Sequence, residues 1–196
     1  LIACALAAAG ARAQPVRVEA VEVELVSART AAVPGQPLAL GLRVRHDPQW
    51  HTYWRNPGDS GLPTKLALTL PEGWRAGGID WPAPHRIFVG PLANYGYDGD
   101  LLLPVVVNVP ASAPPGRVRL AGKASWLMCK EVCIPGEASV ALELPVQPDA
   151  QPSAHAPAFE RSERLTPRER LPVRFSQGAG AISLAFDATG ARRAEF

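Results

Sequence analysis

The stretch "GRVRLAGKASWLMCKEVCIPGEASVALELPV", residues 116–146, carries two alternating segments that flank a pair of cysteines. Apolar and polar residues alternate at 116–127 and again at 138–146, which is the pattern of strands with one buried face. Between these segments, Cys129 and Cys133 are separated by three residues. The stretch therefore predicts two strands that are connected through the cysteine segment.

The spacing of the cysteines limits how this connection can be built. In one straight strand, residues four apart lie about 13 Å from each other, at roughly 3.3 Å per residue. A disulfide needs Cα atoms within about 7 Å, and opposed residues of an antiparallel pair meet that limit. If Cys129 and Cys133 bond, the chain must fold back at Lys130, Glu131 and Val132. A three-residue hairpin loop would then place the cysteines opposite each other on adjacent strands.

Alternating segments recur through most of the chain and predict its fold class. The chain has 21 prolines and 17 glycines, many of them in short turn-like segments between the alternating ones. No helical periodicity runs free of proline over four turns. Six or more short strands with turns at this spacing predict an all-β fold, an immunoglobulin-like antiparallel β-sandwich. The other strands are expected at 16–26, 37–46, 64–70 and 101–109.

The beginning of the chain resembles the end of an export signal. "LIACALAAAGARAQPV" is apolar and rich in alanine, with a small-x-small pattern before Gln14. Residues 1–13 are therefore expected to be a signal-peptide remnant, although Cys4 also fits a lipoprotein cleavage site. Cleavage before Gln14 leaves Cys129 and Cys133 as the two cysteines, in a compartment where disulfides persist.

The later part of the chain changes character. Residues 14–146 are predicted to form the immunoglobulin-like domain, and 147–170 a linker rich in Pro, Ala and charge with at most one short helical turn. Residues 171–196 contain two strand-like segments and are predicted to begin a second β domain that is incomplete here.

The charge balance argues against nucleic-acid binding, and the hydropathy argues against a membrane-spanning helix. Removal of Arg12 with the signal leaves 19 basic and 18 acidic residues, without a basic run, which gives no basis for nucleic-acid binding. No later apolar run approaches the roughly 18 residues that a membrane-spanning helix needs. Any membrane anchor is expected to lie outside this chain.

The cysteine pair by itself allows three kinds of site. A disulfide across so small a loop contributes little stability, which favours thiol–disulfide exchange over a structural role. A structural disulfide remains possible. A copper site is the third alternative, because Cys129, Cys133 and Met128 offer three soft sulfur ligands. Met128 and Cys129 would point to opposite faces of one strand, however. Zinc would need histidines, and His46, His51 and His85 stand at no recognisable spacing.

Several segments together resemble a known family. The cysteine segment "WLMCKEVCIPG" is similar to the cysteine hairpin of the N-terminal periplasmic domain of DsbD-type thiol:disulfide interchange proteins, and is closest to the ScsB-like branch, the suppressor of copper sensitivity proteins. The resemblance covers roughly residues 17–146. It includes, in order, "HTYWRNPGDSGLPTKL" (51–66), "WPAPHRI" (81–87) and "NYGYDGDLLLPV" (94–105).

The resemblance implies a domain that carries reducing equivalents. A membrane-embedded domain of the same full-length protein would supply electrons from the cytoplasm, and the domain would reduce periplasmic thioredoxin-like partners. The family pattern makes Cys133 the attacking thiol and Cys129 the resolving thiol. The chemistry passes through a mixed disulfide, so no small cofactor is implied.

The family also shields its cysteines with a cap loop, which this sequence matches only in part. The corresponding region is "PLANYGYDGD" (91–100), where the acidic pair of the best-known members is not matched. Asn94, Tyr95 and Tyr97 are the cap candidates. Trp126 is a further support candidate, with sandwich core as its more ordinary role. The lone histidines of the matching segments, His51 and His85, are expected to be structural hydrogen-bonding groups.

These observations leave three functions open. The first is a periplasmic dithiol–disulfide relay domain. The second is a copper-handling module that uses the same cysteines, and the third is a non-catalytic interaction domain with a structural disulfide.

Overall fold

A computed structural model describes residues 12–167, 173–178 and 181–186 of the chain. The chain divides into two units, Leu1–Thr166 and Pro167–Phe196. Most of the predicted signal-peptide remnant lies outside the described residues. Within the described ranges, no helix is long and apolar enough to cross a membrane.

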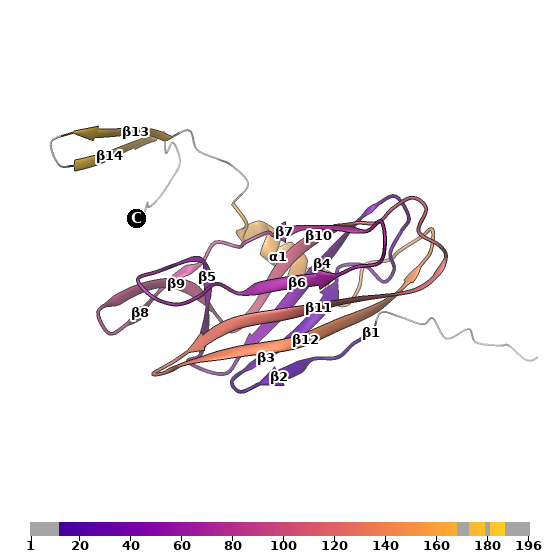
Figure 1. Cartoon of the computed structure of the whole chain (residues 1–196), viewed down its shortest axis with the longest axis horizontal. Coiled ribbons are helices and arrows are strands. Elements are labelled where there is room, and N and C mark those ends of the chain that lie inside the picture. Colours follow the sequence, from indigo (N-terminus) through magenta and orange to yellow (C-terminus); the bar gives the residue numbers. More distant parts are fainter. Residues whose placement is uncertain (1–11, 168–172, 179–180, 187–196) are drawn as a thin grey trace, which may run out of the picture. The chain divides into compact units, whose positions relative to one another are not determined.

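The first unit is built from two antiparallel sheets (Figure 1). One sheet has the strand order β1-β12-β11-β5-β9-β8, and β6 also pairs with β11. Its strands are β1 (Arg12–Ala13), β5 (His51–Gly58), β6 (Lys65–Thr69), β8 (His85–Val89), β9 (Leu92–Asp98), β11 (Gly116–Cys129) and β12 (Cys133–Val146). The other sheet has the order β2-β3-β4-β10-β7. Its strands are β2 (Val16–Val18), β3 (Val21–Ser27), β4 (Pro37–His46), β7 (Arg75–Ile79) and β10 (Asp100–Asn108). The predicted all-β, immunoglobulin-like antiparallel sandwich is confirmed.

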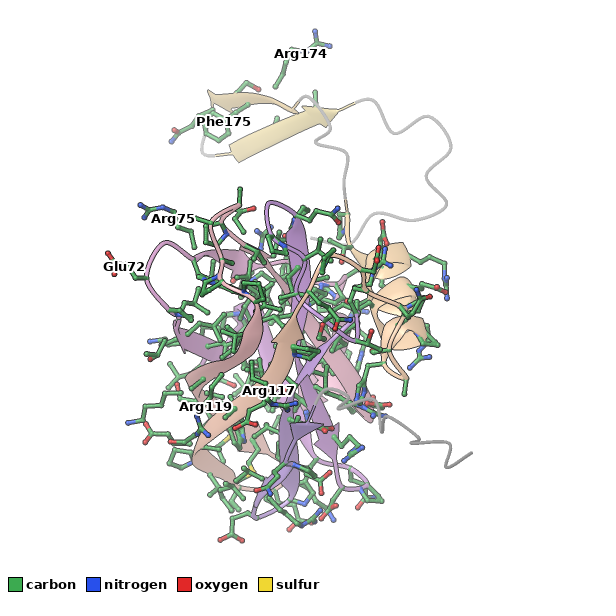
Figure 2. The ribbon with its side chains drawn as sticks, turned by 90° about the vertical axis from the view of Figure 1, so that its right-hand side faces the viewer. Glu72, Arg75, Arg117, Arg119, Arg174 and Phe175 are labelled. Carbon is green, nitrogen blue, oxygen red and sulfur yellow. A yellow bond between two sulfur atoms is a disulfide. The ribbon has the colours of Figure 1, made fainter. Side chains whose placement is uncertain are left out.

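Alternation along each strand separates the core from the surface. On β11, Val118 and Leu120 are buried, whereas Arg117 and Arg119 are exposed and point outward (Figure 2). Burial of the apolar face removes that surface from water, which is the dominant stabilising term of such a fold. The fully buried core side chains come from both sheets and include Val23, Leu25, Leu40, Leu42, Leu103, Leu120, Met128, Leu142 and Leu144.

The longest hairpin carries the cysteines at its turn. β11 and β12 pair in unbroken register from Gly116 opposite Val146 to Cys129 opposite Cys133. The amide of Lys130 donates a hydrogen bond to the carbonyl of Val132 at 3.2 Å, which closes the three-residue loop. The hairpin therefore delivers both cysteines to one end of the first sheet.

Residues 147–166 differ from the linker that their composition predicts. Helix α1 (Ala156–Leu165) packs against β10, and buried Phe159 contacts Val26 and Leu102. The hydroxyl of Ser162 donates a hydrogen bond to the carbonyl of Leu102 at 3.1 Å. A composition typical of a linker can still form a short helix when its few apolar residues pack against the sandwich, as Phe159 does. These residues belong to the first unit.

The second unit is described only as a hairpin. Strands β13 (Val173–Gly178) and β14 (Ala181–Phe186) pair antiparallel, from Val173 opposite Phe186 to Gly178 opposite Ala181. The start of a second β domain at 171–196 stays a prediction, because two strands do not form a core.

Candidate functional site

The two cysteines form a disulfide but differ sharply in exposure. Their sulfurs are 1.97 Å apart and their Cα atoms 4.2 Å apart. Cys129 is buried, with 1% of its surface exposed, whereas Cys133 is exposed. The turn beside it is exposed as well, including Val132 at 63%. A partner that approaches this turn therefore meets the Cys133 sulfur.

Strand β5 supplies the side chains next to Cys133. The hydroxyl oxygen of Tyr53 lies 3.7 Å from Cys133 Sγ, within hydrogen-bond range for sulfur. His51 Nε2 lies 3.4 Å from the same hydroxyl, and the two rings meet edge to face with centroids 5.2 Å apart. The strand register explains this placement, because His51 is paired directly with Cys129 of β11. Residues 51 and 53 share one face of β5.

The loop after β5 folds over the Tyr53 ring. Gly61 has a φ of 97°, and a Cβ at this position would overlap the Tyr53 ring. Pro63 forms a bridge with Tyr53 in the backbone. Tyr53 is consequently only 1% exposed. Burial raises the pKa of the Tyr53 hydroxyl, and a hydrogen bond with Ser60 opposes that rise. The hydroxyl therefore keeps its proton and remains a hydrogen-bond donor.

Asn94, one of the predicted cap residues, is connected to this site through Ser60. Its side chain is fully buried, and its Oδ1 accepts hydrogen bonds from the Ser60 amide at 2.9 Å and the Ser60 hydroxyl at 3.0 Å. Ser60 is also the group that opposes the rise in the pKa of the Tyr53 hydroxyl. Asn94 thus holds the loop that covers Tyr53.

The predicted cap region is largely a regular strand. Most of 91–100 belongs to β9, which pairs with both β5 and β8. Tyr95 is half-buried and lies opposite Arg86 in the β8–β9 register. In place of a cap loop, the chain forms the β8–β9 hairpin, which lies at the same end of the unit as the cysteine turn (Figure 1).

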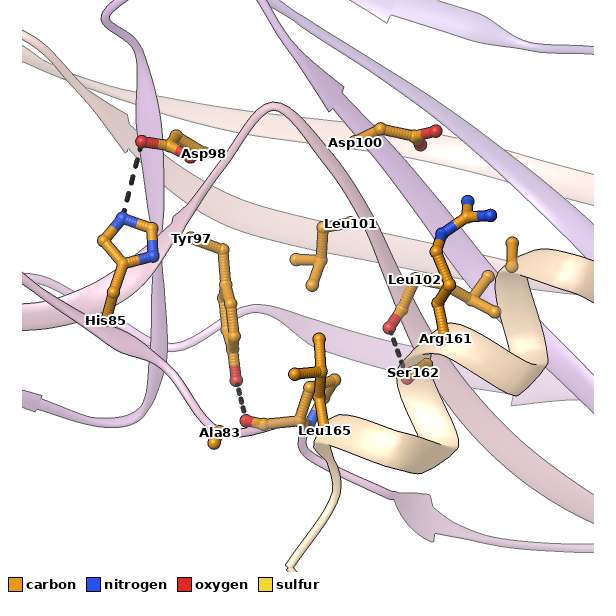
Figure 3. A pocket seen from close by; sticks show the side chains of 12 residues that line it. Ala83, His85, Tyr97, Asp98, Asp100, Leu101, Leu102, Arg161, Ser162 and Leu165 are labelled. Carbon is orange, nitrogen blue, oxygen red and sulfur yellow. Dashed lines mark hydrogen bonds and ion pairs between the residues drawn. The ribbon is translucent and has the colours of Figure 1, made fainter. Parts of the chain in front are cut away.

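Tyr97 lines a cavity whose lining residues do not include Cys129 or Cys133. Its hydroxyl donates a hydrogen bond to the carbonyl of Pro82 at 2.7 Å, and burial raises its pKa. Its side chain lines a cavity of about 340 Å³ between β9, β10 and α1, together with Leu165 and Arg161 (Figure 3). The sequence predicts Tyr95 and Tyr97 as cap residues, but the contact with Cys133 is made by Tyr53.

Trp126 and Met128 both belong to the sandwich core. Trp126 is 4% exposed and Met128 is fully buried. The indole of Trp126 lies over Gly136, its partner in the β11–β12 register, where a Cβ would meet the ring. Alternation turns Met128 into the core, on the strand face opposite to that of Cys129, which argues against the alternative copper site of Met128, Cys129 and Cys133. Within the described ranges, no cluster of three or more His, Cys, Asp or Glu is arranged to hold a metal.

The three histidines near the site have different surroundings. His46 is held by Gly99 O, 2.9 Å from its Nδ1, and by Thr52 Oγ1, 2.9 Å from its Nε2. His85 is exposed and lies 3.4 Å from a carboxylate oxygen of Asp98. Burial lowers the pKa of His51, Asp98 raises it and His85 lowers it, so that this imidazole is predominantly neutral near pH 7.

Neither Tyr53 nor Ser60 is among the site residues predicted from the sequence. Both lie in the segment "HTYWRNPGDSGLPTKL", and Tyr53 stands two residues after His51 on the same strand face. If the segment is taken as a strand, His51 and Tyr53 lie on the same face, because side chains alternate along a strand. The contact between Ser60 and Asn94 depends on the loop after β5, whose sequence has no periodic pattern.

Comparisons with known proteins agree with this geometry. The family model described as "Thiol:disulfide interchange protein DsbD, N-terminal" matches residues 19–145. The N-terminal periplasmic domain of ScsB from Proteus mirabilis aligns with a TM-score of 0.63 and 18% identity, over 88% of this chain and 67% of that chain. The GAE domain of yeast GGA1 aligns with a TM-score of 0.35 and 10% identity, over 72% of this chain and 100% of that chain. A comparison with curated protein sequences finds no match.

The family match includes every element of the cysteine site. Strands β5, β9, β11 and all but the last residue of β12 lie within residues 19–145, which are well over half of the chain. The ScsB domain shares the fold of the described sandwich. Both findings confirm the resemblance seen in the sequence: the chain belongs to the family of N-terminal domains of thiol:disulfide interchange protein DsbD.

Proposed function

We propose that this domain reduces disulfides of periplasmic thioredoxin-like proteins, with Cys133 as the attacking sulfur and Cys129 as the resolving sulfur. The observation that supports this assignment is the exposure of the two residues. Cys133 is open to solvent at the turn, whereas Cys129 is 1% exposed. Only the exposed sulfur can approach a disulfide of another folded protein.

The reaction consists of two exchanges. In the reduced domain, the Cys133 thiolate attacks one sulfur of the partner disulfide; a mixed disulfide forms, and the second partner sulfur leaves as a thiolate. The Cys129 thiolate then attacks Cys133 Sγ, which forms the Cys129–Cys133 disulfide and releases the first partner sulfur. Two electrons and, at the end, two protons have moved to the partner. A Cα separation of 4.2 Å allows the second step without backbone movement.

The electrons that reduce the Cys129–Cys133 disulfide again are proposed to come from a membrane-embedded domain of a longer protein that includes this chain. A dithiol of that domain would attack the Cys129–Cys133 disulfide by the reverse of the same two steps. The ScsB structure that shares this fold is described as an N-terminal periplasmic domain, and this chain spans 67% of it. That description supports a periplasmic location.

The test is to trap the mixed disulfide. The reduced Cys129→Ala variant should attack an oxidised thioredoxin-like protein and remain covalently bound to it, because no resolving thiol is present. The reduced Cys133→Ala variant should form at least about tenfold less complex, because a thiol as buried as Cys129 reacts slowly. Non-reducing gels and mass spectrometry measure both. A complex trapped by Cys133→Ala and not by Cys129→Ala would reverse the assignment.

A further inference from the structure

We propose that His51 accepts the proton of the Cys133 thiol through the hydroxyl of Tyr53, so that β5 carries a proton relay to the attacking sulfur. This inference rests on the proposed role of Cys133. Tyr53 contacts the reacting sulfur, whereas His51 acts through Tyr53. In the disulfide form, the Tyr53 oxygen is 3.7 Å from Cys133 Sγ and 3.4 Å from His51 Nε2.

The relay is shielded from water on its inner side. Tyr53 is 1% exposed and His51 is 5% exposed, while Cys133 is exposed. A proton that leaves the inward face of Cys133 therefore meets the Tyr53 hydroxyl. The loop that follows β5 keeps this hydroxyl in place, because Gly61 lies against the Tyr53 ring and Pro63 forms a backbone bridge with Tyr53.

The charged and titratable groups around His51 come from five strands. On its own strand it meets Tyr53, and its register partner on β11 is Cys129, a thiol in the reduced chain. Asp98 of β9 is its register partner and favours the protonated imidazole. His85 of β8 and His46 of β4 oppose protonation when they are charged themselves. His51 is therefore neutral before the reaction, as a proton acceptor must be, and Asp98 stabilises the imidazolium that forms.

The proton transfer balances as follows. The S–H bond of Cys133 breaks, and its proton moves to the Tyr53 oxygen. The original hydroxyl proton of Tyr53 moves at the same time to His51 Nε2, so that Tyr53 is neutral before and after. The products are a Cys133 thiolate and a His51 imidazolium, separated by one hydroxyl group. The imidazolium later returns the proton by the same path or releases it to solvent.

The experiment measures the pH dependence of alkylation of the reduced 196-residue chain by iodoacetamide. Trypsin cleaves after Lys130 and so separates Cys129 from Cys133, while Cys4 lies in a third peptide. Mass spectrometry then gives the rate for Cys133 alone. In Tyr53→Phe, the midpoint of the Cys133 profile should rise by about one pH unit, and the rate at pH 7 should fall about tenfold.

His51→Gln is the decisive variant, because Gln has no basic nitrogen while Tyr53 keeps its hydroxyl. It should raise the midpoint of the Cys133 profile as Tyr53→Phe does. The alkylation rate at pH 7 should fall about threefold to tenfold. The double variant should be no slower than Tyr53→Phe, because either change alone breaks the relay. His155→Gln, at the N-cap of α1, is the matched control and should leave the profile unchanged.

Two results would overturn the relay. One is a Cys133 profile in His51→Gln that equals that of the unaltered chain. The other is a double variant whose loss equals the product of the two single losses, since independent effects multiply. Circular dichroism checks the fold of each variant, and His51→Gln decides the question if Tyr53→Phe does not fold. Iodoacetamide needs no protein partner, so failure of the relay is distinguishable from failure of the proposed function, which the mixed-disulfide trap tests separately.

Discussion

Two cysteines four positions apart have opposite environments because they stand on opposite sides of a turn. Cys129 ends β11, is 1% exposed and is the register partner of His51. Cys133 begins β12 beyond the three-residue loop and is exposed. Pro135, two residues further, has no amide hydrogen to donate, which suits the edge position of β12 beside the turn, where the described β1 does not reach. The difference in reactivity proposed for the two sulfurs follows from this exposure.

A residue-scale prediction concerns the contact between Gly136 and Trp126. Gly136→Ala should lower the free energy of unfolding by about 1–3 kcal/mol, because the new Cβ would overlap a buried indole that cannot move away freely. Urea denaturation measures the change. Gly78→Ala is the control, since a Cβ at that position has no heavy atom within 4 Å. Equal stability of the two variants would show that the Trp126 ring adjusts without cost.

At the scale of elements, the β11–β12 hairpin holds the site and β5 completes it. Fourteen register pairs run from Gly116–Val146 to Cys129–Cys133, so the ladder fixes both cysteines without help from the sulfurs. β5 contacts this hairpin end through His51 and Cys129 and brings Tyr53 to Cys133. A redox pair placed at the end of such a ladder can open without loss of the strands that support it.

The element-scale prediction is that reduction leaves the fold intact. For a loop closed between residues 129 and 133, the chain-entropy model gives at most about 2 kcal/mol of stabilisation. The reduced chain should therefore retain the far-UV circular dichroism of the oxidised chain and unfold at slightly lower urea concentration. Cys129→Ala with Cys133→Ala should behave like the reduced chain. Loss of the β signal on reduction would make the disulfide a structural one.

At the scale of the whole molecule, the stability of the fold depends on pH, because folding shifts the pKa values of His46, His51 and Asp100. Burial lowers the pKa of His46 below its ordinary 6.5, and the same cause lowers that of His51. The hydrogen bond from Arg43 lowers the pKa of Asp100 below its ordinary 3.8. The histidines act near neutral pH and the carboxylate acts only in acid, so the two effects occupy separate pH ranges.

The prediction at this scale is a two-stage loss of stability in acid. Below about pH 6.5 the unfolded chain binds protons at His46 and His51 that the folded chain does not, so the free energy of unfolding falls as pH falls. A second loss should begin below about pH 3.8, where the unfolded chain protonates Asp100 and the folded chain does not. Urea denaturation at several pH values measures both stages. His46→Gln should flatten the first stage, whereas a slope unchanged in that variant would exclude His46 as its source.

The sequence by itself determined the hairpin that carries the cysteines and part of the remaining strands. Alternation at 116–127 and 138–146 requires two half-buried strands, and the cysteine spacing permits a disulfide only across a tight turn. These are local constraints, since side-chain period and chain reach act over a few residues. For the same reason, the all-β class and the strands at 37–46, 64–70 and 101–109 could be predicted from alternation and turn residues.

Only the tertiary structure decided which side chains surround Cys133. Tyr53 is 80 positions away in sequence, and Asn94 is 34 positions from the Ser60 that it holds. Such contacts depend on which strands become neighbours, and β5 meets β9 and β11 through sheet pairing that no local pattern encodes. The same reason applies to α1, whose composition is that of a linker but whose Phe159 packs against Val26 of β3 and Leu102 of β10. Packing between segments far apart in the sequence, and not local propensity, placed these residues.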